Sequence, residues 1–181
     1  MRSYTVEGIV IKRINFGEAD WLVTLFTKSQ GKVTVTAKGV RKLSSKRAGA
    51  LELFNLIKVQ IVKGRGELAT LTEVQIINTF PSWRKYLGRI TLAYHMCEAV
   101  DKLTADHQPH PQVFEILKKS LLEIGNLKID WKLKIKDWLR EILVDLGFWP
   151  RDKEFTGNIY ELVETISSRS YNSPKLLEKL K

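Results

Sequence analysis

The sequence predicts an α+β protein in which a five-stranded barrel at the N-terminus is followed by an all-helical domain. Two observations lead to this fold class. The first eighty residues contain short alternating segments separated by turn signals, as is typical of all-β barrels and sandwiches. From Pro81 onward, apolar residues recur every three or four positions, which is the period of a helix. We therefore expect a β domain over residues 1–82 and a helical domain over residues 83–181.

The N-terminal domain contains segments rich in β-branched and aromatic residues, which favour strands. The predicted strands are residues 4–14, 21–27, 32–37, 53–62 and 68–80. The first three are joined by short loops whose glycines, Gly17 and Gly31, can adopt a positive φ in tight turns. A longer polar connection separates the third strand from the fourth. Five strands with this excursion match the strand count of an OB-fold, a partly open barrel that often binds oligonucleotides.

The C-terminal domain is predicted to consist of helices. They are expected over residues 83–102, 111–124, 131–146, 159–167 and 174–180. The third is the clearest, because Trp138, Leu139 and Ile142 fall on one helical face. Gly147 and Pro150 should end it.

Charge and composition restrict the possible partners. The chain of 181 residues has a formal net charge of +10, and residues 1–82 account for +7 of it with thirteen basic and six acidic residues. Such an excess favours polyanionic partners, either nucleic acid or an anionic membrane. The sequence shows no signal peptide and no apolar run of about 18 residues, so we expect a soluble, cytoplasmic protein without a membrane partner. Cys97 is the only cysteine, which excludes an intramolecular disulfide and a cysteine-rich zinc site.

The longest run of basic residues without an acid lies between the third and fourth strands, and we expect it to be an exposed loop that follows phosphates. Its candidate nucleic-acid-binding residues are Lys38, Arg41, Lys42, Lys46 and Arg47. Further candidates on or near the barrel strands are Lys12, Arg13, Lys32 and Arg65. Phe16, which lies in a loop, is the best candidate for stacking on a base. The alternative is that these cations are ordinary solvated residues that keep the protein soluble.

The sequence contains only weak matches to catalytic motifs, and we expect neither an enzyme nor a cofactor. His95 and Cys97 are two residues apart on a predicted helix and so do not face the same way. His107 and His110 flank a proline-containing loop without a nearby pair of carboxylates, which makes a weak metal site. Gly64 and Gly66 lie between strands, and the Lys-Ser/Thr of a phosphate-binding P-loop does not follow them.

Several motifs, in order and at characteristic spacing, resemble the N-terminal domain of the RecO family. They are residues 7–13 (EGIVIKR), 17–20 (GEAD), 22–27 (LVTLFT), 31–32 (GK), 37–41 (AKGVR) and 64–72 (GRGELATLT). The later residues 146–150 (LGFWP) resemble the family's Leu-Gly-aromatic-x-Pro turn. The resemblance implies an N-terminal OB-fold that binds DNA through basic residues matching Lys38 and Arg41, and also Lys32 and Arg65.

The same resemblance implies a role in recombinational DNA repair that needs no catalytic residue. Members of the family bind single- and double-stranded DNA and anneal complementary strands covered by single-strand-binding protein. With RecR they help to load RecA in gap repair. This sequence has no cysteines after Pro150, where many relatives have a four-cysteine zinc module, so we expect a form that is shortened internally.

Two other binding functions stay open on the sequence alone. The barrel could bind RNA, as other OB-folds do. The helical domain could instead be an adaptor for an acidic, apolar peptide such as the tail of single-strand-binding protein. Lys132, Lys136 and Arg140, beside the apolar face of the third helix, would then contact that partner.

Overall fold

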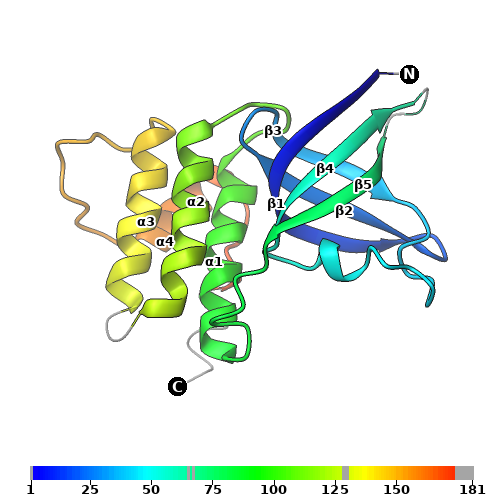
Figure 1. The fold of residues 1–181 in the computed structure, drawn as a ribbon. Helices are drawn as coiled ribbons and strands as arrows, with labels where there is room; N and C mark the ends of the chain where they lie inside the picture. The colour runs from blue at the N-terminus through cyan, green and yellow to red at the C-terminus, as the bar shows by residue number, and fades with distance from the viewer. Residues whose placement is uncertain (1, 65, 67, 128–130, 174–181) are drawn as a thin grey trace. The chain divides into compact units, whose positions relative to one another are not determined.

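The computed structural model describes residues 2–64, 66, 68–127 and 131–173. They form two compact units (Figure 1). One comprises Met1–Thr79 with Asp106–Pro111, and the other comprises Phe80–Ala105 with Gln112–Lys181. The predicted helix over residues 174–180 lies outside the described residues, as does the candidate Arg65.

Five strands form the first unit: β1 (Arg2–Phe16), β2 (Asp20–Thr27), β3 (Gly31–Ala37), β4 (Leu56–Lys63) and β5 (Ala69–Asn78). They close into a barrel in the order β1-β2-β3-β5-β4. Adjacent strands are antiparallel except for β3 and β5, which pair in parallel at Val35 with Ala69 and at Thr36 with Thr70. The long β1 pairs with both β2 and β4, and its register with β2 shifts between Val10 and Lys12. The predicted five-stranded barrel followed by helices is confirmed.

The barrel core follows from the period-two pattern of its strands. Val23 and Leu25 of β2 and Val33 and Val35 of β3 are at most 2% exposed and belong to one apolar cluster. Successive side chains of a strand point to opposite faces, so alternate residues of neighbouring strands meet inside the barrel. The β-branched and aromatic residues of β2 and the alternation in β3 therefore located both strands to within one residue at each end.

The fourth strand begins later than the predicted residue 53, because the chain turns sharply before it. Phe54 has a φ of 73°, which a strand does not contain, and its N–H donates to the Val10 carbonyl at 2.8 Å. The Asn55 carbonyl accepts from the Val10 N–H at 3.0 Å. This turn ends the long β3–β4 connection and joins it to the middle of β1.

A short segment between two helices returns to the barrel, which no sequence pattern indicated. The His107 N–H donates to the Lys32 carbonyl at 2.9 Å, and the Lys32 ammonium lies 3.5 Å from the Asp106 carboxylate. Gly31, with a φ of +67°, lies so close to Gln108 that a Cβ would clash with its backbone. The segment therefore covers the start of β3.

The second unit contains α1 (Leu87–Leu103), α2 (Pro111–Glu123), α3 (Trp131–Asp145) and α4 (Ile159–Ser167). The predicted start of the first helix at residue 83 is wrong by four residues. Trp83 follows the apolar period, but it lies in a turn, where its side chain is fully buried and its indole N–H donates to the Leu121 carbonyl at 2.8 Å. None of the helices in the described part of the chain is long and apolar enough to cross a membrane.

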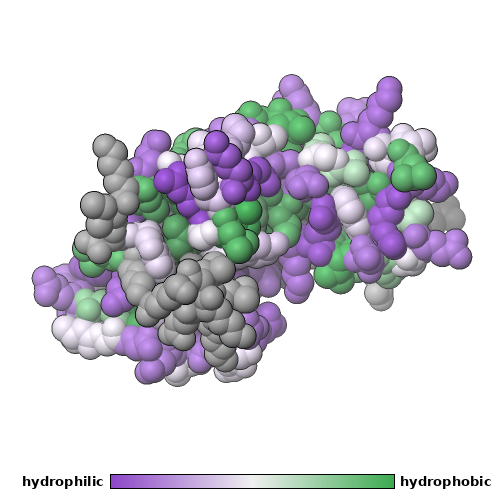
Figure 2. Space-filling view, turned by 90° about the horizontal axis from the view of Figure 1, so that it is seen from below, coloured by the Kyte–Doolittle hydropathy of each residue, from purple (hydrophilic) through white to green (hydrophobic). Residues whose placement is uncertain are grey.

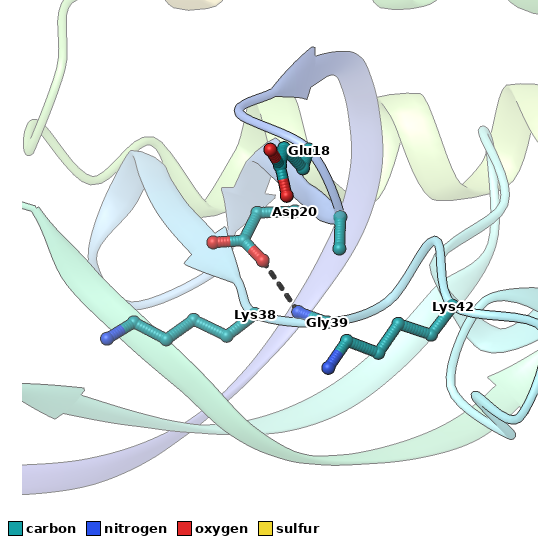
Figure 3. A pocket seen from close by; sticks show the side chains of 6 residues that line it. Glu18, Asp20, Lys38, Gly39 and Lys42 are labelled. Atoms are coloured by element: carbon teal, nitrogen blue, oxygen red, sulfur yellow. Dashed lines mark hydrogen bonds between the residues drawn. The ribbon is translucent and has the colours of Figure 1, made fainter.

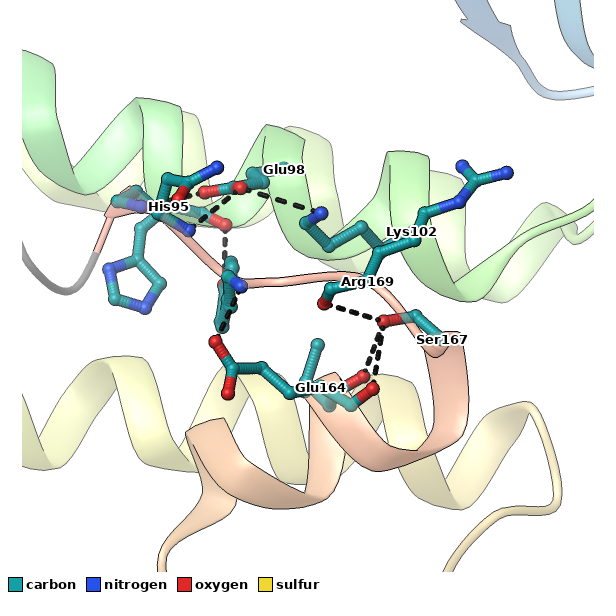
Figure 4. A network of polar contacts seen from close by, with 10 residues as sticks. His95, Glu98, Lys102, Glu164, Ser167 and Arg169 are labelled. Carbon is teal, nitrogen blue, oxygen red and sulfur yellow. Dashed lines mark hydrogen bonds and ion pairs between the residues drawn. The ribbon is translucent and has the colours of Figure 1, made fainter.

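Residues 171–173 are tied to α1 and α4 by a polar network (Figure 4). The Tyr171 hydroxyl donates to the His95 carbonyl at 2.7 Å, and its N–H donates to the Glu164 carboxylate at 2.6 Å. The Glu98 carboxylate accepts from the N–H groups of Asn172 and Ser173 at 3.0 and 2.8 Å. The network fixes this end of the described chain to the helical unit.

Candidate nucleic-acid interface

The β1–β2 turn and the start of the β3–β4 connection are joined by hydrogen bonds (Figure 3). The Gly39 N–H donates to the Asp20 carboxylate at 2.7 Å, and the Arg41 N–H donates to the Ala19 carbonyl at 2.9 Å. The Arg41 guanidinium also donates to the Gly17 carbonyl at 3.2 Å. The motifs at residues 17–20 and 37–41 are therefore one structural unit, although the sequence separates them.

Two glycines and one apolar side chain make this unit possible. Gly17 and Gly39 have φ angles of +56° and +64°, a region in which a side chain is disfavoured. Val40, between the exposed Lys38 and Arg41, is only 1% exposed and belongs to the barrel core. A buried anchor in the middle of a polar run holds the loop against the barrel while its neighbours face water.

The far end of the connection is fixed by side chains that bind carbonyl groups. The Arg47 guanidinium donates to the Lys38 carbonyl at 2.7 Å and to the Thr72 carbonyl at 3.3 Å. The Asn55 amide donates to the carbonyls of Gly49 and Ala50, both at 3.0 Å. Arg47 is therefore an anchor of the loop, since its hydrogen-bonding groups are engaged by the protein itself.

Between these anchors lies a set of exposed cations, which we call the loop cations: Lys38, Arg41, Lys42 and Lys46. Among the described residues, no hydrogen bond or ion pair is formed by the ammonium groups of Lys38, Lys42 and Lys46. Leu43, at the tip of the same stretch, is fully exposed. The geometry thus presents several unpaired charges on a loop that is held at both ends.

A shallow pocket of about 590 Å³ lies beside the loop cations, lined by Glu18, Ala19, Asp20, Lys38, Gly39 and Lys42. In Figure 3 the Lys38 side chain extends away from the loop and the Lys42 side chain lies alongside it, whereas Asp20 points toward the Gly39 N–H. Two carboxylates and two ammonium groups share this pocket, so it is not a uniformly cationic cavity. The other two loop cations, Arg41 and Lys46, are not among the residues that line this pocket.

The other basic candidates of the barrel have different environments. Lys32 is 7% exposed and paired with Asp106. The Arg13 guanidinium lies 4.0 Å from the centre of the Trp21 ring and 3.9 Å from the Glu52 carboxylate. Lys12 is exposed on β1. The partners given above for Lys32 and Arg13 are Asp106, Trp21 and Glu52, and none of these is a loop cation.

The aromatic residues divide between core and surface. Phe26 and Phe54 are at most 3% exposed, whereas Phe16 is 46% exposed beside the β1–β2 turn. Phe16 thus has the accessibility that a stacking residue needs. Whether it contacts a base stays a prediction.

In the helical unit, the residues proposed for a protein partner differ in what the structure describes of them. Lys136 is exposed on α3. Arg140 is half-buried, and its guanidinium donates to the carbonyls of Arg151 and Lys153 at 3.0 and 3.2 Å. The side chain of Lys132 is outside the described part of the structure. Of the three residues, Lys136 is the one whose side chain the structure describes as exposed.

His95 and Cys97 are buried in the helical unit and do not form a catalytic pair. Burial lowers the pKa of His95 to about 3, and its ring packs against the rings of Tyr160 and Tyr171 with centroids 4.9 and 4.8 Å away. Burial raises the pKa of the Cys97 thiol far above its ordinary value. Within the described residues, no group of three or more His, Cys, Asp or Glu side chains is placed to hold a metal ion.

Sequence reasoning missed the residues that position the loop, chiefly Asp20 and Asn55. Each acts through a backbone group far along the chain, so no local pattern could identify its partner. The available signal was the joint occurrence of the two motifs at residues 17–20 and 37–41.

Comparison with known proteins agrees with the architecture. A family model described as "Recombination protein O N terminal" matches residues 1–80, and one described as "Recombination protein O C terminal" matches residues 84–153. Together the two matched segments extend over both units.

Curated relatives show the same similarity, and those compared here are named "DNA repair protein RecO". The chain is 37% identical over 124 residues to the Myxococcus xanthus protein, covering 68% of this chain and 51% of the relative. It is 35% identical over 150 residues to the Symbiobacterium thermophilum protein, covering 83% and 59%. It is 31% identical over 144 residues to a Listeria monocytogenes protein, covering 80% and 56%. The chain thus spans only about half to three fifths of the length of these relatives, and by its matches in both units it belongs to the RecO family.

Proposed function

We propose that this chain binds DNA in recombinational repair and that the loop cations contact the phosphates. The observation that supports the proposal best is the set of exposed cations on a loop held at both ends, of which the Lys38, Lys42 and Lys46 ammonium groups have no partner among the described residues. A loop whose backbone is already held loses little backbone freedom on binding, which favours affinity. Similarity to relatives named "DNA repair protein RecO" supports the choice of DNA.

The loop would contribute affinity rather than sequence specificity. Contacts to phosphate release counterions from the strand and carry no information about its bases. Neutralised strands repel one another less, which is the physical requirement for annealing two complementary strands. We therefore propose that the chain anneals such strands and, together with RecR and single-strand-binding protein, assists the loading of RecA. None of these steps needs a catalytic residue.

A pair of matched double variants tests the role of the loop. Lys42→Met with Lys46→Met removes two loop cations, and Lys58→Met with Lys63→Met removes the same charge from exposed positions of β4. Affinity for a single-stranded oligonucleotide is measured by fluorescence anisotropy at one salt concentration. We expect the loop variant to bind at least about tenfold more weakly than the β4 variant. Equal losses would mean that net charge alone governs binding.

The annealing role needs its own measurement. Complementary strands coated with single-strand-binding protein are mixed with and without the chain, and duplex formation is followed by energy transfer. We expect faster annealing with the chain and a smaller increase with the loop variant. Annealing that the chain does not accelerate would refute this part of the proposal while leaving DNA binding intact.

RNA is the alternative ligand for such a barrel, and direct competition decides between them. Phosphates are common to both polymers, so the loop cations cannot discriminate between them. A DNA oligonucleotide bound to the chain is displaced with unlabelled DNA or RNA of the same sequence. Displacement by RNA at a lower concentration than by DNA would favour an RNA-binding function.

A further inference from the structure

An exposed aromatic ring lies near two cations where the chain enters α1. The Tyr86 side chain is 48% exposed, and the Lys85 ammonium and the Arg89 guanidinium lie 5.3 and 5.0 Å from its ring centre. Leu87, the next residue, is 63% exposed. On the face that Figure 2 shows, apolar side chains lie in groups among hydrophilic ones. We call residues 84–89 the Tyr86 patch.

Hydrogen bonds to neighbouring packed residues hold the patch in place. The buried Trp83 donates its indole N–H to the Leu121 carbonyl at 2.8 Å, and the Tyr86 N–H donates to the Trp83 carbonyl at 2.9 Å. The Arg89 guanidinium donates to the carbonyls of Gly125 and Leu127 at 2.6 and 3.3 Å. The backbone at Tyr86 and the Arg89 side chain are therefore held by packed residues at and just after the end of α2.

The surrounding sequence is free of negative charge. No acidic residue occurs between Glu73 and Glu98, whereas Arg84, Lys85 and Arg89 all lie in this interval. The patch thus combines an exposed aromatic face with a local excess of positive charge, and the barrel loop is not part of it.

We propose that the Tyr86 patch is a second contact for single-stranded DNA, located on the helical unit. Tyr86 stacks on one base, and the exposed Lys85 attracts a neighbouring phosphate. Arg89, whose guanidinium is held by the Gly125 and Leu127 carbonyls, adds its positive charge to the site. The arrangement fits a nucleotide, in which a single sugar separates the aromatic base from the phosphate. The two cations lie 5.3 and 5.0 Å from the centre of the Tyr86 ring, so a base on the ring would have its phosphate near positive charge. An acidic peptide would use the cations but has no requirement for the aromatic face. The inference rests on the proposed DNA-binding function and adds a site that binds bases by stacking.

The test separates stacking from charge. Tyr86→Leu keeps an apolar side chain but removes the aromatic face, Tyr86→Phe keeps the face, and Tyr94→Leu makes the same change at another exposed tyrosine of α1. Each variant is titrated with a single-stranded oligonucleotide and with an abasic strand of the same length and charge. We expect Tyr86→Leu to weaken binding of the base-containing strand at least about fivefold, and not to weaken binding of the abasic strand. Tyr86→Phe and Tyr94→Leu should resemble the wild type.

Other results would overturn the inference. An equal loss for both strands, or no loss for Tyr86→Leu while the loop variants still lose affinity, would remove the second contact and leave the proposed function standing. A loss of binding to a glutamate-rich peptide without a loss of DNA binding would assign the patch to a protein partner. A wild-type chain that binds no strand at all would refute both proposals together.

Discussion

Arg47 and Lys42 carry the same charge in the same loop, and the structure assigns them different tasks. Arg47 donates to the carbonyls of Lys38 and Thr72 at 2.7 and 3.3 Å, whereas the Lys42 side chain is exposed. We predict that Arg47→Met lowers the free energy of unfolding of the barrel and that Lys42→Met does not. Methionine keeps the apolar stem of arginine, so the comparison isolates the polar contacts.

The magnitude follows from the hydrogen bonds that are lost. A hydrogen bond to a charged group contributes about 1.5–3 kcal/mol, and solvent competes for the half-buried Arg47. The two shorter bonds together then contribute about 1–3 kcal/mol, because partial exposure reduces each of them. Lys42→Met should change the free energy of unfolding by less than about 0.5 kcal/mol, as exposed substitutions usually do.

Urea unfolding, followed by circular dichroism, measures the free energy of unfolding of both variants. DNA titration at several salt concentrations measures how steeply their binding constant for DNA depends on salt. We expect Lys42→Met to make the salt dependence less steep by about 0.7 in the slope of log K against log salt for single-stranded DNA. Equal stability of the two variants would refute the assignment of Arg47 as the anchor of the loop.

Three further predictions concern the framework of the two units. Gly31→Ala should destabilise the barrel by about 2 kcal/mol or more in urea unfolding, because alanine disfavours a φ of +67° and its Cβ would clash with Gln108, whereas Gly49→Ala, with open space around it, should be nearly neutral. Cys97 should react with a thiol reagent at pH 8 only after the chain is unfolded, since it is 1% exposed and burial raises its pKa; rapid reaction of the folded chain would contradict this packing. The pKa of His95 falls from 6.5 to about 3 on folding, so the unfolded chain binds the proton first and stability is lost as the pH falls below about 6.5. This loss should reach about 2 kcal/mol at pH 5 and should be missing from a His95→Leu variant, whose urea unfolding is compared with that of the wild type at pH 7.5 and pH 5.

The fold could be predicted from the sequence because its signals are local. β-Branched and aromatic composition located β2, and alternation located β3. The helical period of Trp138, Leu139 and Ile142 located α3, where all three are buried. The start of α1 was predicted too early because Trp83 fits the helical period while its side chain packs from a turn. Periodicity reports which side chains are buried, but it does not distinguish a helix from a turn that buries the same residue.

The site was predicted less completely than the fold, because its geometry depends on distant partners. The basic run was identified as a loop, but the sequence could not distinguish the anchored Arg47 from the exposed Lys42. Lys32 was grouped with the binding residues, although the structure pairs it with Asp106, which lies far along the chain. Charge can be counted from a sequence, whereas the carbonyl or carboxylate that engages it cannot.

The central claim, that the loop cations contact DNA phosphates, is tested most directly by the salt dependence of binding. The variant replaces Lys38, Lys42 and Lys46 together with methionine, and log K for a single-stranded oligonucleotide is measured against log salt beside the wild type. Three lost phosphate contacts predict a slope that is less steep by about 2. An unchanged slope would contradict the assignment of the loop to DNA.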